Sequence, residues 1–137
     1  MKRIIFFFLV IISILGCSGS GVDGTWKGYE LGGGVPPSSW YIDISGERFN
    51  AIHLLASGEK ENYNGTIKLS SSDNGVNKYS VFINFGSGIG MNYILKYATD
   101  KDKYFSLYDN SSDAKFQATM ELDGISGGGI IYLEAKK

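Results

Sequence analysis

Alternation of apolar and polar residues is the feature that most constrains the fold of this chain. From Gly24 onward, apolar side chains recur at every second position, and turn residues interrupt the pattern roughly every 8 to 15 positions. This period is typical of strands buried on one face, because successive side chains of a strand point to opposite faces. The alternation is clearest at 40–45, 62–69, 78–85, 91–97 and 115–122, and weaker at 25–31, 48–55, 103–109 and 130–135. We therefore expect an all-β domain of about eight or nine strands.

Short connectors predict that neighbouring strands are antiparallel. Asn74-Gly75 is the firmest hairpin signal, because Asn and Gly tolerate the positive φ angles of a two-residue turn. Asn64-Gly65 has the same residue types, but the alternation continues through it, so we expect a bulge or a glycine required for packing. No segment has a helical period long enough for a crossover connection. The prediction is an up-and-down meander closed into a small barrel, which removes both sheet edges; a two-sheet β-sandwich is the alternative.

The first seventeen residues predict where the protein is located in the cell and not how it folds. They consist of a basic pair at positions 2–3, an apolar run over 4–15, the small residue Gly16 and the only cysteine, Cys17. The apolar run is shorter than the ~20 residues that span a bilayer as a helix, which favours a signal peptide. The segment resembles the lipobox of bacterial lipoproteins. That resemblance implies cleavage after residue 16 and addition of a diacylglycerol and an N-acyl group to Cys17; an ordinary signal peptide or an uncleaved apolar helix is the alternative.

The predicted lipid anchor at Cys17 is followed by a short tether and then by the folded domain. We expect residues 17–23 to be the lipidated Cys17 with a Gly/Ser tether of ~20 Å, and 24–137 to be one domain with a single core. Ser18 is not the aspartate that keeps lipoproteins in an inner membrane. The resemblance therefore implies the bacterial envelope, and the outer membrane where the cell has two.

The charge composition of the chain excludes some classes of binding partner. The chain has 13 basic and 14 acidic residues without a Lys/Arg-rich block, so we expect neither nucleic-acid binding nor a polybasic membrane patch. The membrane is expected as a partner only through the lipid. Once Cys17 is lipidated, no thiol remains for a disulfide or a thiolate metal site.

Gly24-Thr25-Trp26 stands at the start of the first predicted strand. Together with the predicted meander, this motif is similar to the lipocalin and wider calycin group, in which a Gly-x-Trp opens the barrel and the tryptophan plugs its closed end. The group often packs an arginine from near the last strand over that tryptophan. This chain has no arginine after Arg48, and Lys136 or Lys137 is the available substitute.

Residues that could carry out catalysis are few, and we expect no enzyme activity. His53 is the only histidine and lies on an apolar face in the register of Phe49 and Ala51, so we interpret it as a structural or rim histidine. No Gly-x-Ser-x-Gly elbow supports a serine nucleophile. The glycine-rich 86–90 segment precedes a predicted strand, not the helix that a phosphate-binding loop needs.

Metal binding is not expected either. One histidine and no free thiol exclude the usual zinc ligand sets. Asp100 with Asp102, and Asp109 with Asp113, could offer oxygen ligands to calcium, but the two turns lie at opposite ends of a predicted strand. We interpret these aspartates as turn residues.

Aromatic residues are abundant, at 14% of the chain, and are the remaining candidates for a binding site. A small barrel has room for its own side chains or for one small ligand, so these rings either fill the core or line a pocket. The candidate ligand-lining residues are Trp40, Tyr63, Tyr79, Tyr93, Tyr97 and Phe116. Two hypotheses remain: a membrane-anchored, lipocalin-like barrel that binds a small apolar ligand, or a surface interaction or adhesion module with a filled core that contacts an envelope or host protein.

Overall fold

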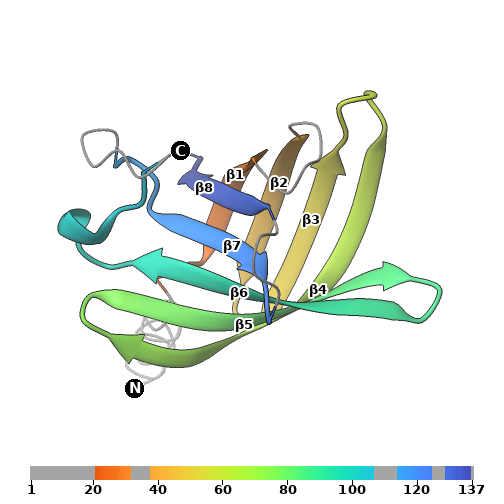
Figure 1. Cartoon of the computed structure of the whole chain (residues 1–137). Coiled ribbons are helices and arrows are strands. Elements are labelled where there is room, and N and C mark those ends of the chain that lie inside the picture. The colour runs from red at the N-terminus through yellow and green to blue at the C-terminus, as the bar shows by residue number, and fades with distance from the viewer. Residues whose placement is uncertain (1–20, 32–37, 107–113, 125–128, 137) are drawn as a thin grey trace, which may run out of the picture.

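The computed structural model describes residues 21–31, 38–106, 114–124 and 129–136 (Figure 1). The strands are β1 (Gly24–Leu31), β2 (Ser38–Ser45), β3 (Arg48–Leu54), β4 (Lys60–Asp73), β5 (Val76–Gly86), β6 (Ile89–Ala98), β7 (Ala118–Leu122) and β8 (Ile130–Ala135). The predicted signal peptide, Cys17, Asp109 and the 110–113 turn lie outside the described residues.

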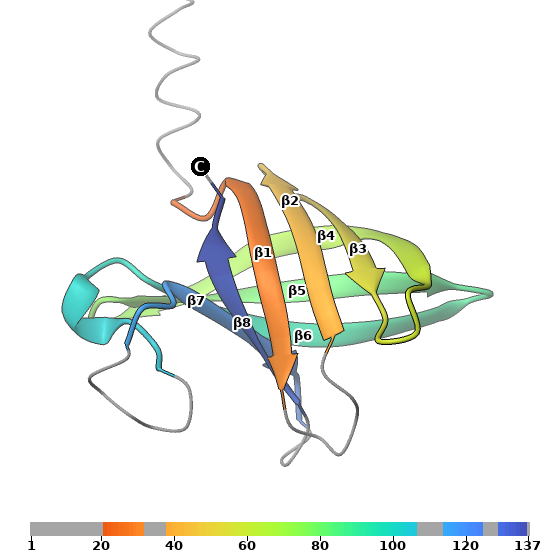
Figure 2. The ribbon, with the colours of Figure 1, turned by 90° about the horizontal axis from the view of Figure 1, so that it is seen from above.

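Each strand pairs antiparallel with the next, and β8 pairs with β1 to close a barrel of eight strands. Figure 2 shows β1, β2 and β3 crossing β5 and β6 at a steep angle. The predicted all-β meander and its closure are confirmed, and the sandwich alternative is wrong because β1 has a strand on both sides. No helix in the described ranges is long and apolar enough to cross a bilayer.

The predicted strand at 103–109 is wrong over its described part. Lys101–Lys103 form a short 3₁₀ turn, η1, and Phe105 makes only an isolated bridge to Phe116. The Asp100 side chain accepts a hydrogen bond from the backbone N–H of Asp102 at 3.2 Å. This local side-chain bond favours a turn, and it outweighs an alternation only a few residues long.

Two predictions about glycines are settled. Asn74 and Gly75 have φ angles of 53° and 82° and form the β4–β5 hairpin, as predicted. Gly65 is a regular strand residue opposite Ile83, and a Cβ at this position would run into the carbonyl oxygen of Phe82. It is therefore the packing glycine that the continuous alternation indicated; the irregular pairing comes later, between Leu69 and Ser71.

The barrel interior is filled through its middle by the inward-facing residues of the strands. The largest fully buried side chains are Val22, Ile42, Phe49, Val81, Ile83, Leu95, Met120, Ile131 and Leu133. These residues come from β2, β3, β5–β8 and the segment just before β1, and the buried Trp26 of β1 and Ile67 of β4 belong to the same core cluster. The described part of the chain therefore carries its own core, and the closed barrel has no edge strand along its body. We therefore treat the barrel as a unit that folds without its lipid anchor.

Two residues on the predicted inner face are instead exposed: Leu69 at 49% and Met91 at 44%. The β3–β4 ladder ends at Thr66, and the β6–β7 ladder begins only at Tyr93. Leu69 and Met91 thus lie where the long hairpins extend beyond the barrel and have a strand on one side only. The β5–β6 hairpin projects in this way in Figure 2.

Trp26 closes the end of the barrel at which β1 begins. Its Nε1 donates to the carbonyl oxygen of Val22 at 2.8 Å, and its ring meets Tyr97 edge-on with the centroids 6.0 Å apart. Val22 itself is 1% exposed, so the packed domain begins two residues before the predicted boundary at Gly24. Lys136 does not take the place of the arginine: its Nζ lies 5.3 Å from the ring centroid of Tyr41.

Candidate functional site

A depression of about 310 Å³ lies at the end of the barrel opposite Trp26. It forms where β1 ends, β2 begins, β3 ends, β4 begins and the β5–β6 hairpin turns. We call this region the mouth; its residues are Glu30, Trp40, His53, Glu61, Tyr63, Phe85, Ile89, Met91 and Tyr93. They come from six consecutive strands, so the meander itself assembles the mouth.

Four aromatic rings form a continuous arc in the mouth. The centroids of Trp40 and Tyr63 are 6.2 Å apart, those of Tyr63 and Phe85 4.6 Å, and those of Phe85 and Tyr93 6.5 Å. Tyr63, Phe85 and Tyr93 are half-buried and pack against the core from the solvent side. The arc is therefore an apolar wall open to a ligand on one side.

The lip of the mouth is apolar and exposed. Ile89 and Met91 lie at the start of β6 and are 55% and 44% exposed. Both belong to the part of the β5–β6 hairpin that has no second neighbouring strand. Scattered single apolar residues on a surface are common, but these two lie beside an aromatic depression, which makes the mouth a candidate binding surface.

Glu30 is the polar centre of the mouth. One of its oxygens, Oε1, accepts a hydrogen bond from Ser38 Oγ at 2.9 Å and another from Trp40 Nε1 at 3.1 Å. The ring of His53 stacks on Trp40 with the centroids 4.0 Å apart and the planes 13° apart. The two donors fix the position of the carboxylate and the indole, and the stacking orients the imidazole.

The direction of the hydrogen bonds between His53, Ser38 and Glu30 does not suit a serine nucleophile. His53 Nε2 and Ser38 Oγ are 2.8 Å apart, which is the distance a nucleophilic pair would have. However, Ser38 donates its only proton to Glu30, so its oxygen accepts from the His53 N–H. A nucleophilic serine needs the reverse direction, with the histidine accepting. The other nitrogen, Nδ1, lies 3.9 Å from Glu61 Oε1, beyond hydrogen-bond distance.

Both tyrosine hydroxyls of the mouth are held in the neutral form. The pKa of Tyr63 is raised to about 12, and burial of the hydroxyl is the largest cause. The hydrogen bond between Tyr63 and Glu61 and the negative charge of Glu61 raise this pKa further. Burial also raises the pKa of Tyr93, followed by the charge of Glu30. The two hydroxyls are therefore hydrogen-bonding groups and not bases at neutral pH.

Three of the six predicted ligand-lining residues meet in the mouth: Trp40, Tyr63 and Tyr93. Tyr79 is buried lower in the core, and Tyr97 lies at the closed end, where its hydroxyl accepts from Gln117.

Phe116, the last of the six, is 3% exposed, but it belongs neither to the mouth nor to the core cluster that fills the barrel. Its ring centroid lies 6.2 Å from that of Tyr29 and 5.3 Å from that of Tyr132. The reason is that β7 begins only at Ala118, so the regular strand does not extend back to Phe116 although the alternation in the sequence does.

Sequence reasoning missed Glu30, Ser38 and Glu61. The signal for the two glutamates was present in the alternation. Glu30 has the parity of Trp26 on β1, and Glu61 has the parity of Tyr63 on β4, so each is a charged residue at an inward position. An acidic residue on an apolar face is uncommon unless it is paired, which marks a candidate site.

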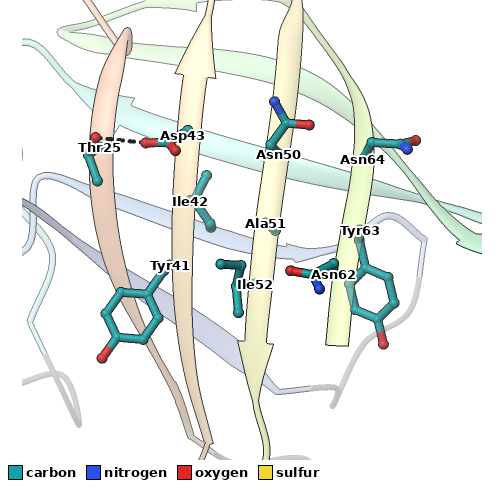
Figure 3. A pocket seen from close by; sticks show the side chains of 10 residues that line it. All are labelled: Thr25, Tyr41, Ile42, Asp43, Asn50, Ala51, Ile52, Asn62, Tyr63 and Asn64. Atoms are coloured by element: carbon teal, nitrogen blue, oxygen red, sulfur yellow. Dashed lines mark hydrogen bonds between the residues drawn. The ribbon is translucent and has the colours of Figure 1, made fainter. Parts of the chain in front are cut away.

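A second depression, of about 370 Å³, lies on the outer surface of β1–β4. Thr25, Asp43, Asn50 and Asn64 form one row across the four strands, and Thr25 Oγ1 donates to Asp43 at 2.7 Å (Figure 3). All four side chains are exposed and already hydrated, so a ligand would gain little by replacing that water. This groove is the weaker candidate.

No group of three or more metal-ligating side chains occurs in the described part of the chain. Asp100 and Asp102 belong to the η1 turn, as interpreted from the sequence. In comparisons with known proteins, no protein-family model, no curated protein and no solved structure matched the chain.

Proposed function

We propose that this protein is a membrane-anchored envelope lipoprotein whose lipocalin-like barrel binds a small apolar ligand in the mouth and performs no catalysis. The observation that carries the proposal is the aromatic arc with its exposed apolar lip around about 310 Å³. A volume of this size is at the lower end of small-molecule sites, and the mouth shares their composition: apolar walls with a few polar groups.

Desolvation supplies the affinity. The half-buried rings and the lip of Ile89 and Met91 expose apolar surface that a ligand would remove from water, at about 25 cal/mol per Å². The core below the mouth is filled, so the ligand is expected to seat at the end of the barrel and not along its axis. Polar orientation comes from the Tyr63 and Tyr93 hydroxyls and from Glu61.

The direction of the hydrogen bonds in the mouth argues against catalysis by Ser38 and His53. Ser38 donates to Glu30, and no carboxylate lies within hydrogen-bond distance of His53 Nδ1 in the described network. A His53→Ala variant is expected to keep ligand binding within a few-fold, with its loss limited to the stacking on Trp40.

The binding test uses residues 17–137 with Cys17→Ser and the neutral fluorescent probe N-phenyl-1-naphthylamine. We expect a saturable rise in fluorescence with one site per chain, and a loss of affinity of about tenfold or more in Phe85→Ala. Phe82→Ala is the matched control, because Phe82 is on the same strand but faces outward and is 43% exposed. Unsaturable uptake, or equal loss in both variants, would contradict the proposal.

The anchor is tested separately. Metabolic labelling with palmitate should mark the full-length chain and should be abolished by Cys17→Ser. Labelling that persists in the variant would show that the lipid is elsewhere.

A second candidate is a surface interaction module, favoured by the outward polar row on β1–β4, which Asn84 extends onto β5. Rows of amides and carboxylates on a sheet can bind a polar polymer. Binding to immobilised envelope polysaccharide, lost in the double variant Asn50→Ala with Asn64→Ala and kept in Phe85→Ala, would support this alternative.

A further inference from the structure

The mouth contains two acidic side chains and no basic one apart from the imidazole of His53. Glu30 and Glu61 line it, whereas no Lys or Arg does. The nearest lysine in sequence, Lys60, precedes Glu61 and by alternation faces the other side of β4. An apolar depression of this kind has a negative potential, and that charge restricts which apolar ligands can enter.

We propose that the mouth selects apolar ligands that carry one positive charge, namely organic ammonium ions, and rejects fatty acids and other anions. This inference rests on the proposed function, because it names the chemical class of the ligand for the same mouth.

Glu61 is the carboxylate that is available to a ligand. Glu30 already accepts two hydrogen bonds through Oε1, and His53 Nε2 lies 3.4 Å from the same oxygen. The side chain of Glu61 is 46% exposed, and its described partners are the Tyr63 hydroxyl and the more distant His53 Nδ1. A carboxylate has about four acceptor positions, so Glu61 keeps acceptor positions for a cation.

The aromatic arc complements the carboxylates. The ring faces of Trp, Tyr and Phe attract cations, and quaternary ammonium groups are commonly bound by several rings together. Tyr63 lies between the carboxylate of Glu61 and the ring of Phe85, so one ligand could contact a charge and an aromatic wall at once.

The pKa shifts of the two tyrosines are consistent with a negative potential in the mouth. The charge of Glu61 contributes to the raised pKa of Tyr63, and the charge of Glu30 to that of Tyr93, after burial in both cases. A field that disfavours a phenolate in the mouth also disfavours a carboxylate or sulfonate head group.

The experiment displaces N-phenyl-1-naphthylamine from residues 17–137 carrying Cys17→Ser with three compounds of equal chain length: hexyltrimethylammonium, 1-hexanol and hexanesulfonate. We expect the ammonium to compete about tenfold better than the alcohol, and the sulfonate to compete worst. Raising the salt concentration should reduce the preference, because screening weakens charge interactions at an open site.

Glu61→Gln is expected to remove most of the preference for the ammonium over hexanol, and the probe affinity of the variant is measured first so that the two competitors are compared in the same protein. Glu134→Gln is the matched control, since Glu134 is exposed on β8 outside the mouth, and it should retain the preference. Glu30→Gln is a second variant, read only with its melting temperature, because Glu30 holds Ser38 and Trp40 in place.

The outcomes separate the two proposals. If hexanol competes but the ammonium gains nothing over it, or if the sulfonate competes best, the charge inference is overturned and the apolar mouth remains. If the probe itself shows no saturable binding, the proposed function fails. Retention of the ammonium preference in Glu61→Gln and in a folded Glu30→Gln would also overturn the inference.

Discussion

Val22→Ala is the variant that best tests where the packed domain begins. Val22 is 1% exposed and lies beneath Trp26, whose indole donates to its carbonyl oxygen. The substitution keeps that backbone acceptor and removes only two methyl groups. It therefore isolates the packing of the segment before β1 from the hydrogen bond.

The cost follows from burial. Two methyl groups removed from the core lose about 0.8 kcal/mol each in transfer free energy. The residual cavity adds about 24 cal/mol per Å³ where the surroundings do not collapse. Together these give a loss of about 2 kcal/mol in the free energy of unfolding, or about 6 to 10 °C in melting temperature for a domain of this size.

The assay is urea unfolding of residues 17–137 with Cys17→Ser, followed by tryptophan fluorescence and circular dichroism. We expect a lower midpoint with an unchanged m-value. Val76→Ala is the control; Val76 is half-buried at the start of β5, so about half the effect is expected. If Val22→Ala unfolds within about 0.5 kcal/mol of the parent, the segment before Gly24 is not packed and the reasoning is refuted.

Three further results are expected. Gly65→Ala should cost about 3 kcal/mol in urea unfolding, because its methyl group meets the backbone carbonyl of Phe82 and neither strand can yield easily; a loss below about 1 kcal/mol would contradict the close approach. Leu69→Ser should change stability by less than about 0.5 kcal/mol, since Leu69 is 49% exposed on the protruding hairpin. Tyr63 should ionise at about pH 12 in an absorbance titration, and Glu61→Gln should lower that pKa part of the way to 10.0. Because the folded-state pKa is raised, the stability linked to this hydroxyl is complete below pH 10.0 and is lost as the pH rises to about 12.

Alternation predicted the face of most strand residues but not their height along the barrel. Tyr93 and Tyr97 share a face of β6, yet Tyr93 is in the mouth and Tyr97 packs against Trp26 at the other end. Four residues at ~3.3 Å each separate them by ~13 Å. Height depends on how each strand pairs with its neighbours, and that register comes from long-range contacts that a single strand pattern does not contain.

The same limit explains the polar centre of the mouth. Glu30 and Ser38 are paired across β1 and β2, but they lie on opposite sides of the predicted loop between two strands. Only the register brings Ser38 and Trp40 to the same carboxylate oxygen. His53 was correctly predicted to lie on an apolar face near a rim, whereas its stacking on Trp40 required the β2–β3 pairing.

The docking of Val22 at the closed end sets the direction in which the barrel would stand on a membrane. If Cys17 carries the lipid as proposed, Val22 lies five residues after it, at most ~18 Å away. The closed end then faces the headgroups and the mouth opens toward the aqueous compartment. A barrel in that orientation cannot draw its ligand from the leaflet that holds it, so cargo must arrive through water or be handed over by another carrier.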